Sequence, residues 1–298
     1  MNILITGGTG FIGRNLIKSF QANNHRSYIL TRFPDNYTDT NDEIYISYDH
    51  PVAQLPTIHA VINLAGESLF GYWSKKKREA ILNSRIDTTN NVIEIIKKLH
   101  KRPDVFISGS AVGYYGTSED LMFTEVTEKP GEDFLASVVV QWEKYAKQVE
   151  EMGIRTVYTR FGVVLGVDGA LPYMSLPVKL FAGGKIGDGE QWISWIHIED
   201  AIKLINFCIA NEHINGSVNI TAPNPRRNKD LMKKLAKVLK RPYWFPTPSP
   251  LIHAVMGEMS QLITKGQYVL PNKSLDAGFQ FSYPNLEEAL KEIAQKGL

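Results

Sequence analysis

The sequence predicts an α/β fold built on a doubly wound parallel sheet, and two observations support this prediction. The first is a series of short apolar runs, each typical of a strand that is buried on both faces of a sheet. The second is that amphipathic helical patterns separate these runs, as expected for βαβ units. The runs cover residues 2–6, 27–31, 60–66, 105–110 and 155–160, and the longest helical patterns cover residues 74–99 and 133–147.

Glycines at positions 7, 8, 10 and 13 follow the first apolar run directly, and a helical pattern begins among them. In this arrangement Gly7 allows a tight turn, Gly10 lets the backbone approach a pyrophosphate, and Gly13 lets the helix pack closely on the sheet. The amide groups and the positive dipole end of the helix then face the phosphates. A strand, a glycine turn and a helix in this order predict a dinucleotide site in a Rossmann fold.

Composition indicates a globular enzyme rather than a nucleic-acid-binding or membrane protein. The chain has 298 residues, of which 43% are hydrophobic, and its net charge of +2 is too small for a dedicated nucleic-acid binder. The single cysteine, Cys208, excludes an internal disulfide and a cysteine-based zinc site, and no metal site is predicted. With no leader and no long apolar run, we expect a cytoplasmic monomer or homodimer that binds a small molecule.

The end of the second strand indicates which dinucleotide binds. NAD enzymes usually carry an acidic residue there, which binds the ribose 2′-hydroxyl. Here the strand ends in Thr31 and Arg32, and the nearest acid, Asp35, lies beyond Phe33 and Pro34. A guanidinium group suits the 2′-phosphate of NADP, although a solvated arginine at a strand end is the alternative. The sequence therefore predicts NADP as the cofactor.

The spacing Gly7-x-x-Gly10-x-x-Gly13 resembles the nucleotide loop of the extended short-chain dehydrogenase/reductase families, which include sugar-nucleotide epimerases and dehydratases. Five further motifs accompany it: Asn63-Leu-Ala-Gly-Glu67, Ser84-Arg85, Val112-Gly-Tyr-Tyr115, Trp142-Glu143 and Ser194-Trp-Ile-His197. Together they resemble an atypical subfamily of "epimerase family proteins" with a short, distinctive C-terminal domain. The resemblance implies a Rossmann domain that binds NADP, with a smaller α+β C-terminal substrate domain.

The glycine motif and the resemblance together predict the residues that bind the cofactor. Glu67 is expected to contact a ribose or a substrate, or alternatively to cap the next helix. Arg85 is expected to reach a phosphate or a substrate anion, or alternatively to form a surface salt bridge. The full expected set is Gly7, Thr9, Gly10, Phe11, Ile12, Gly13, Thr31, Arg32, Leu64, Ala65, Gly66, Glu67, Arg85, Arg160 and Val163.

The acid/base pair of the family, Tyr-x-x-x-Lys, is missing from the expected helix. When Glu143 is aligned with the family's glutamate, Leu135 takes the place of the tyrosine and Val139 that of the lysine. Neither side chain can transfer a proton. Ser110 lies where relatives keep a hydroxyl that polarises the reacting group, although it is alternatively only a turn-capping serine. Ser110 and Tyr114, a phenol close by in sequence, are the predicted catalytic residues.

These expectations describe an NADP-dependent oxidoreductase or epimerase-like enzyme that acts on a small polar substrate. The alternative is a non-catalytic NADP-binding sensor or scaffold that has lost the acid/base pair. We expect a Rossmann domain over residues 1–165 with a return segment near 193–222, and a small substrate domain over 166–192 and 223–298. The glycine-rich loop before Trp192 suits substrate binding, although a plain surface turn is the alternative. His197 is expected to pack at a helix end, with a catalytic role as the alternative.

Overall fold

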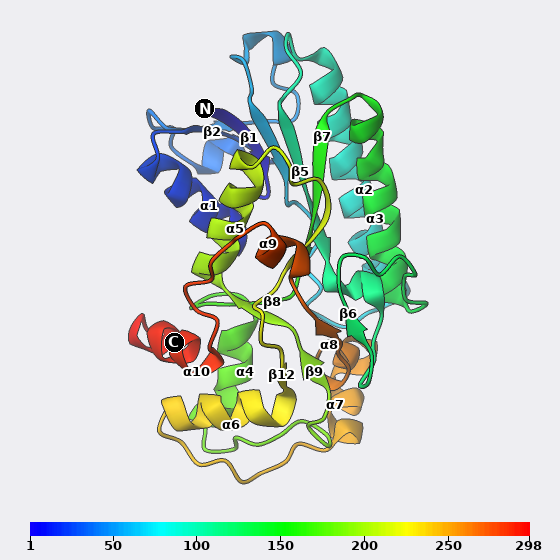
Figure 1. Cartoon of the computed structure of the whole chain (residues 1–298), viewed down its shortest axis with the longest axis vertical. Coiled ribbons are helices and arrows are strands. Elements are labelled where there is room, and N and C mark those ends of the chain that lie inside the picture. Colours follow the sequence, from blue (N-terminus) through cyan, green and yellow to red (C-terminus); the bar gives the residue numbers. More distant parts are fainter.

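The computed structural model describes residues 1–298, except for the side chains of Leu251 and Val255. Its upper part in Figure 1 is a parallel sheet between helices, and its lower part is a smaller group of helices and short strands. The sheet has seven strands in the order β11-β7-β5-β4-β1-β2-β3, and every pairing is parallel. Because the order reverses between β1 and β4, the sheet is doubly wound, as predicted. The strands are β1 (Asn2–Thr6), β2 (Arg26–Leu30), β3 (Glu43–Ile46), β4 (Ala60–Asn63), β5 (Val105–Ala111), β7 (Arg155–Phe161) and β11 (Gly216–Ile220).

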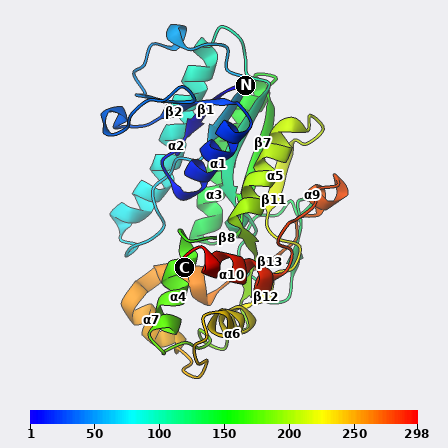
Figure 2. The ribbon, with the colours of Figure 1, turned by 90° about the vertical axis from the view of Figure 1, so that its left-hand side faces the viewer.

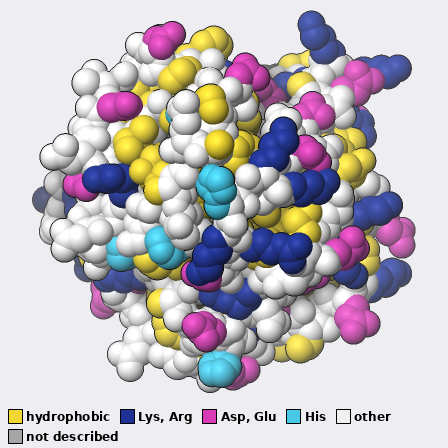
Figure 3. Space-filling view, turned by 90° about the horizontal axis from the view of Figure 1, so that it is seen from above, with side chains coloured by type: hydrophobic (Ala, Val, Ile, Leu, Met, Phe, Trp, Pro, Cys, Tyr) yellow, Lys and Arg dark blue, Asp and Glu magenta, His cyan; other side chains and the backbone are white. Residues whose placement is uncertain are grey.

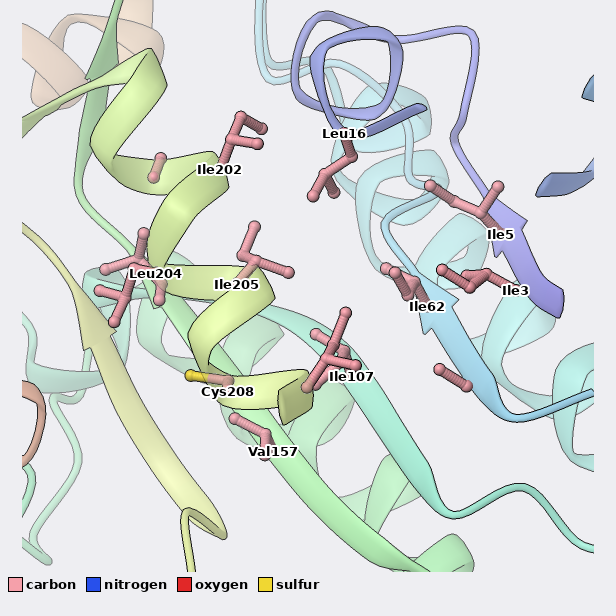
Figure 4. Packing of buried hydrophobic residues seen from close by; sticks show 14 of the residues in the cluster. Ile3, Ile5, Leu16, Ile62, Ile107, Val157, Ile202, Leu204, Ile205 and Cys208 are labelled. Atoms are coloured by element: carbon pink, nitrogen blue, oxygen red, sulfur yellow. The ribbon is translucent and has the colours of Figure 1, made fainter. Parts of the chain in front are cut away.

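Helices cover both faces of the sheet (Figures 1 and 2). Helices α1 (Phe11–Ala22) and α5 (Ile198–Ala210) pack on one face, and α2 (Lys75–Lys98) and α3 (Phe134–Glu151) pack on the other. Figure 4 shows Leu16 of α1 and Ile205 of α5 over Ile5 and Ile62 of the sheet. Both faces of the sheet are therefore shielded from water, which explains why the sequences of the strands are continuous apolar runs.

The predicted starts of the two long helices are confirmed by their N-terminal caps, whereas α3 continues to Glu151, beyond the predicted Lys147. The side chain of Ser74 accepts a hydrogen bond from the Lys77 amide, so α2 begins one residue later. Asp133 caps α3 in the same way, through the Ala136 amide. A side-chain oxygen satisfies an amide that has no partner inside the helix, which stabilises the start of the helix by about 1 kcal/mol.

The lower part has its own hydrophobic cluster. Helices α4 (Ala170–Lys179), α6 (Asn228–Val238) and α10 (Leu286–Gln295) pack there around Trp195 and Leu165. Three short strand pairs accompany them, namely β8 (Val163–Leu165) with β10 (Trp195–His197), β9 (Trp192–Ile193) with β12 (Arg226–Arg227), and β6 (Met122–Phe123) with β13 (Tyr268–Val269). This is the smaller α+β part expected from the sequence, and the domain boundaries given above stay a prediction.

One helix expected in this part is divided. The pattern over residues 251–262 predicts a single helix, but α7 (Ser249–Met256) and α8 (Gln261–Thr264) are separated by a 3-10 turn that begins at Gly257. Gly257 has a φ of +57°, a conformation that favours glycine, and an added Cβ would lie 2.8 Å from the Tyr72 ring. Helix α9 (Asn272–Asp276) and the proline-containing α4 had not been predicted.

The surface carries charges of both signs. In Figure 3, basic and acidic side chains alternate over much of the face seen from above, as the small net charge leads one to expect. Among the described residues, no helix combines the length and the apolar character that crossing a bilayer requires.

Candidate functional site

A cavity of about 970 Å³ lies at the carboxyl ends of the strands, between the sheet and the lower part. The glycine loop and the ends of β4 and β5 line its upper half, and α4, α6, α7 and α8 line its lower half. Pockets for one small molecule measure roughly 300–1,000 Å³. The cavity is therefore large for a single ligand, and a dinucleotide and a substrate can meet in it.

The three motif glycines differ in what surrounds them. Gly7 has a φ of +70°, and a Cβ there would lie 2.8 Å from the backbone of Leu64 and Ala65. At Gly13 a Cβ would lie 2.2 Å from the Gly7 carbonyl oxygen, because α1 packs directly on the turn. At Gly10 a Cβ would meet only that same oxygen, at 3.2 Å. Gly10 thus faces open space and leaves the first turn of α1 without a side-chain cap, which fits a pyrophosphate.

The end of β2 lies beside the end of β1, since Leu30 is the register partner of Thr6. Arg32 follows two residues later and is exposed, with its guanidinium 5.8 Å from the Phe33 ring centre. Asp35 lies in the next turn, η1 (Pro34–Asn36), beyond the strand end. Arg32 does not line the cavity itself, and its contact with a 2′-phosphate stays a prediction.

Glu67 forms an ion pair, in which its Oε1 lies 2.6 Å from Lys77 Nζ. The hydrogen bond from Lys77 lowers the pKa of the Glu67 carboxyl. The alternative that Glu67 caps the next helix is wrong, because Ser74 caps α2. Contact of Glu67 with a ribose or a substrate stays a prediction.

Arg85 is half-buried against the cavity wall rather than paired at the surface. Its Nη1 donates to the carbonyl oxygens of Ile81 (2.8 Å) and Glu67 (3.1 Å). Its guanidinium carbon lies 5.1 Å from the centre of the Trp142 ring, and burial lowers its pKa to about 10. The surface salt bridge considered for Arg85 is therefore wrong, and a positive charge borders the cavity here.

Ser110 lines the cavity and ends a chain of buried polar groups. Its Oγ donates to Glu143 Oε1 at 2.6 Å. Arg160 holds the same carboxylate through Nε and Nη2, each at 2.8 Å, and donates from Nη1 to the Tyr115 hydroxyl. The two charged side chains are 4% and 12% exposed, so the pair is shielded from water. Ser110 lies within β5 rather than capping a turn. Arg160 does not line the cavity, and its expected cofactor contact stays a prediction.

Neither phenol that follows Ser110 in the sequence faces the cavity. The Tyr114 hydroxyl donates to the Glu128 carbonyl oxygen at 2.7 Å, and the ring lies 3.5 Å from the Arg160 guanidinium carbon. Tyr115 is buried and donates to Asn219 Oδ1 at 2.8 Å. By contrast, Leu135 and Val139, which were expected from the sequence at the places of the family's acid and base, line the cavity directly. The geometry therefore argues against Tyr114 as a proton donor and leaves Ser110.

Nine of the predicted site residues share one cavity wall, and eight do not line it. Those on the wall are Gly7, Gly10, Phe11, Ile12, Gly13, Leu64, Arg85, Ser110 and Val163. Those off it are Thr9, Thr31, Arg32, Ala65, Gly66, Glu67, Tyr114 and Arg160. The sequence missed most of the lower wall, which includes Tyr173, Met174, Met232, Met256, Leu262 and Lys265. Among the sequence predictions, only the expected substrate loop before Trp192 indicated part of the lower wall. Gly184, Ile186 and Trp192 itself line the cavity.

Comparison with known proteins identifies the family. The profile of the NAD dependent epimerase/dehydratase family matches residues 3–221, most of the chain. The chain belongs to this family. A second profile, a domain of unknown function (DUF1731), matches residues 247–293. The resemblance inferred from the motifs is therefore confirmed, including the distinctive C-terminal region.

Relatives and solved structures agree with this assignment. The epimerase family protein YfhF of Bacillus subtilis is 46% identical over 98% of both chains. A Staphylococcus aureus epimerase family protein, SAR0825, is 39% identical over 98% of this chain and 99% of its own. The crystal structure of human epimerase family protein SDR39U1 with NADPH superimposes with a TM-score of 0.89, at 33% identity and full coverage of both chains. A Thermotoga maritima UDP-glucose 4-epimerase shares the fold, with a TM-score of 0.77 at 19% identity.

Proposed function

We propose that this chain is an NADP(H)-dependent oxidoreductase that reduces a carbonyl or a conjugated carbonyl compound. The observation that carries the proposal is the single cavity that joins the glycine loop to Ser110 and continues into the lower part. A cofactor bound by the loop and a substrate bound below it would meet at the end of β5. Open α/β sheets bind their ligands at this edge, where the strand order reverses.

Two observations support NADP rather than NAD. Arg32 stands at the end of β2, where an acidic residue would bind the ribose of NAD, and no acid precedes the turn that follows. The human relative of 33% identity was solved with NADPH. Gly10, the amide groups of α1, Arg32 and Arg85 are the groups proposed to hold the cofactor.

The proposed chemistry gives Ser110 the role of hydrogen-bond donor to the substrate oxygen. NADPH held by the glycine loop would supply the hydride for the substrate carbon, and the substrate oxygen would take its proton from water. The Ser110 hydroxyl turns from Glu143 to the substrate oxygen, while the Glu143 carboxylate keeps its two bonds from Arg160. Because the hydroxyl exchanges a charged acceptor for a neutral one, the rearrangement costs about 1 kcal/mol. The Glu143–Arg160 pair thus positions Ser110 without touching the substrate.

The sensor alternative rests on Leu135 and Val139, two lining residues whose side chains carry no titratable group. The two functions are separated by presenting the NADPH complex with panels of aldehydes, ketones, enones and quinones while following the nicotinamide absorbance. Oxidation of NADPH by a panel member, lost in Ser110→Ala, supports the reductase. If NADPH binds and no panel member is turned over, the sensor is favoured.

A further inference from the structure

We propose that the substrate of this site is a largely apolar molecule that carries a carbonyl group and a single anionic group, and that Lys265 binds the anion. The proposal rests on the proposed reductase function and narrows its substrate class. It departs from the expectation of a small polar substrate, because apolar side chains predominate in the lower wall of the cavity, although Thr247, Gln261 and Gln267 also line it.

Apolar side chains from four separate elements face one another across the lower half of the cavity. Tyr173 and Met174 come from α4, Met232 from α6, Met256 from α7, and Leu262 from α8. Three of these five residues are methionines, whose flexible and polarisable side chains adapt to apolar ligands of different shape. Leu135 and Val139 extend the same apolar wall up to the neighbourhood of Ser110.

Charged side chains are few on this wall. Among the lining residues that the structure describes, only Arg85, Asp133 and Lys265 are charged. Arg85 donates to two backbone carbonyls, and Asp133 caps α3 by accepting from the Ala136 amide. Lys265 is exposed and follows α8 directly, and within the described part of the chain it has no ion-pair partner. It is the lining cation that remains available to a ligand.

The polar uncharged groups are partly engaged with the protein as well. Ser194 donates to the Gln267 carbonyl oxygen at 2.7 Å and accepts from the Val269 amide at 2.9 Å. Asn228 accepts from the Ile186 amide at 2.9 Å. A sugar nucleotide would bring a doubly charged diphosphate and several hydroxyl groups into this wall, and burying such groups without partners is costly. A ligand with one anion and a hydrocarbon body matches the groups that are present.

The test measures binding to the NADPH complex through displacement of a fluorescent apolar probe, so that it does not depend on turnover. Two ligand series are compared, n-alkyl methyl ketones and oxo-carboxylates with the same chain lengths. Each added methylene is expected to tighten binding about fourfold until the lower half of the cavity is filled. Each carboxylate is expected to bind at least about tenfold tighter than its neutral counterpart, as a charge-assisted contact predicts. Binding that is independent of chain length, or displacement of the probe by UDP-sugars instead, overturns the proposal.

Three variants identify the residues involved. Lys265→Met is expected to abolish the advantage of the carboxylates and to leave the ketones unchanged, whereas Lys179→Met, an exposed α4 lysine that does not line the cavity, changes neither series. Met174→Trp adds bulk to the lower wall and is expected to end the chain-length dependence at a shorter ligand. If Lys265→Met weakens NADPH binding instead, the lysine belongs to the cofactor site and the anion assignment is wrong. Chain-length-dependent binding without any NADPH oxidation refutes the reductase function and leaves this substrate class standing.

Discussion

The two halves of the cavity are built in different ways. The upper half is made of backbone and small residues, and its central piece is one continuous segment, residues 7–13. The lower half is made of apolar side chains that come from distant segments, between α4 at residue 170 and the chain after α8 at residue 267. In the upper half, the backbone fixes the positions of the groups that bind a ligand. The lower half instead offers an apolar surface whose volume and polarity suit a ligand.

This difference explains what each half can bind. A pyrophosphate needs amide groups and open space at fixed positions, which excludes a side chain at Gly10. Gly13 must also lack a side chain, so that α1 can pack on the Gly7 turn. An apolar wall tolerates exchange among residues of similar volume, because dispersion and burial are not directional. The upper half therefore suits one ligand shared by many relatives, and the lower half suits a substrate particular to this chain and its near relatives.

The largest expected effect separates binding from folding in the upper half. Gly10→Val is expected to weaken NADPH binding at least about a hundredfold, because the side chain occupies the space for the pyrophosphate. The apo-protein is expected to lose far less thermal stability than with a side chain at Gly13, since an added Cβ at Gly10 meets only the Gly7 oxygen, at 3.2 Å. Isothermal titration calorimetry and thermal denaturation measure the two quantities.

Gly13→Ala is the matched control for this experiment. Its Cβ would lie 2.2 Å from the same oxygen, so it is expected to lower the unfolding temperature clearly. Gly10→Val protein that still binds NADPH would show that the loop is not the cofactor site. Destabilisation by Gly10→Val as large as that by Gly13→Ala would contradict the distinction between the two glycines.

The second effect concerns the place where the two halves meet. Ser110→Ala is expected to lower kcat about a hundredfold for any substrate found, the usual scale for a lost proton-transfer or polarising group. NADPH affinity is expected to stay the same, because Ser110 is proposed to act on the substrate oxygen. Tyr114→Phe serves as the control: its hydroxyl contacts the Glu128 carbonyl away from the cavity, so kcat should not change. A loss in Tyr114→Phe that equals the loss in Ser110→Ala would restore the phenol as the acid.

The third effect is smaller and tests the rim of the upper half. NADPH is expected to bind about tenfold tighter than NADH, and Arg32→Ala is expected to abolish this preference, since one charge-assisted contact with the 2′-phosphate supplies about 1.4 kcal/mol. Calorimetric titration of NADPH and NADH into the wild type and Arg32→Ala measures this preference. Equal affinities in the wild type would mean that the exposed guanidinium of Arg32 is only solvated.

The sequence predicts the upper half of the cavity better than the lower half. Glycine spacing and apolar runs predict the sheet, the loop and the position of Ser110, because local backbone geometry demands those residue types. The roles expected of Arg160 and Tyr114 stay predictions, and linear position could not show that the Arg160 guanidinium turns toward Glu143 and the Tyr114 phenol toward Glu128. The lower wall carries no motif, because its apolar residues meet only after the chain has folded.

His197 joins the two parts of the molecule and gives the smallest expected effect. As the sequence indicated, it lies at a helix end, where its Nδ1 accepts from the Glu199 amide and caps α5. Its Nε2 lies 2.9 Å from Glu292 Oε2 on α10, so the ring is held in the neutral form with the proton on Nε2. Burial lowers the pKa of His197, and the nearby Glu292, Glu199 and Asp200 oppose this shift only in part.

Because the pKa of His197 is lower in the folded protein than the ordinary 6.5, the unfolded chain takes up a proton first as the pH falls. The stability that His197 contributes is therefore complete above about pH 6.5 and is lost as the pH falls through and below that value. Protonation at Nδ1 would also remove the cap of α5, because that nitrogen could no longer accept. Urea unfolding at a series of pH values is expected to show a weaker decrease in stability below pH 6.5 in His197→Asn, whose amide oxygen can cap the helix without titrating. An unchanged pH profile in this variant would show that the junction between the two parts does not sense pH through His197.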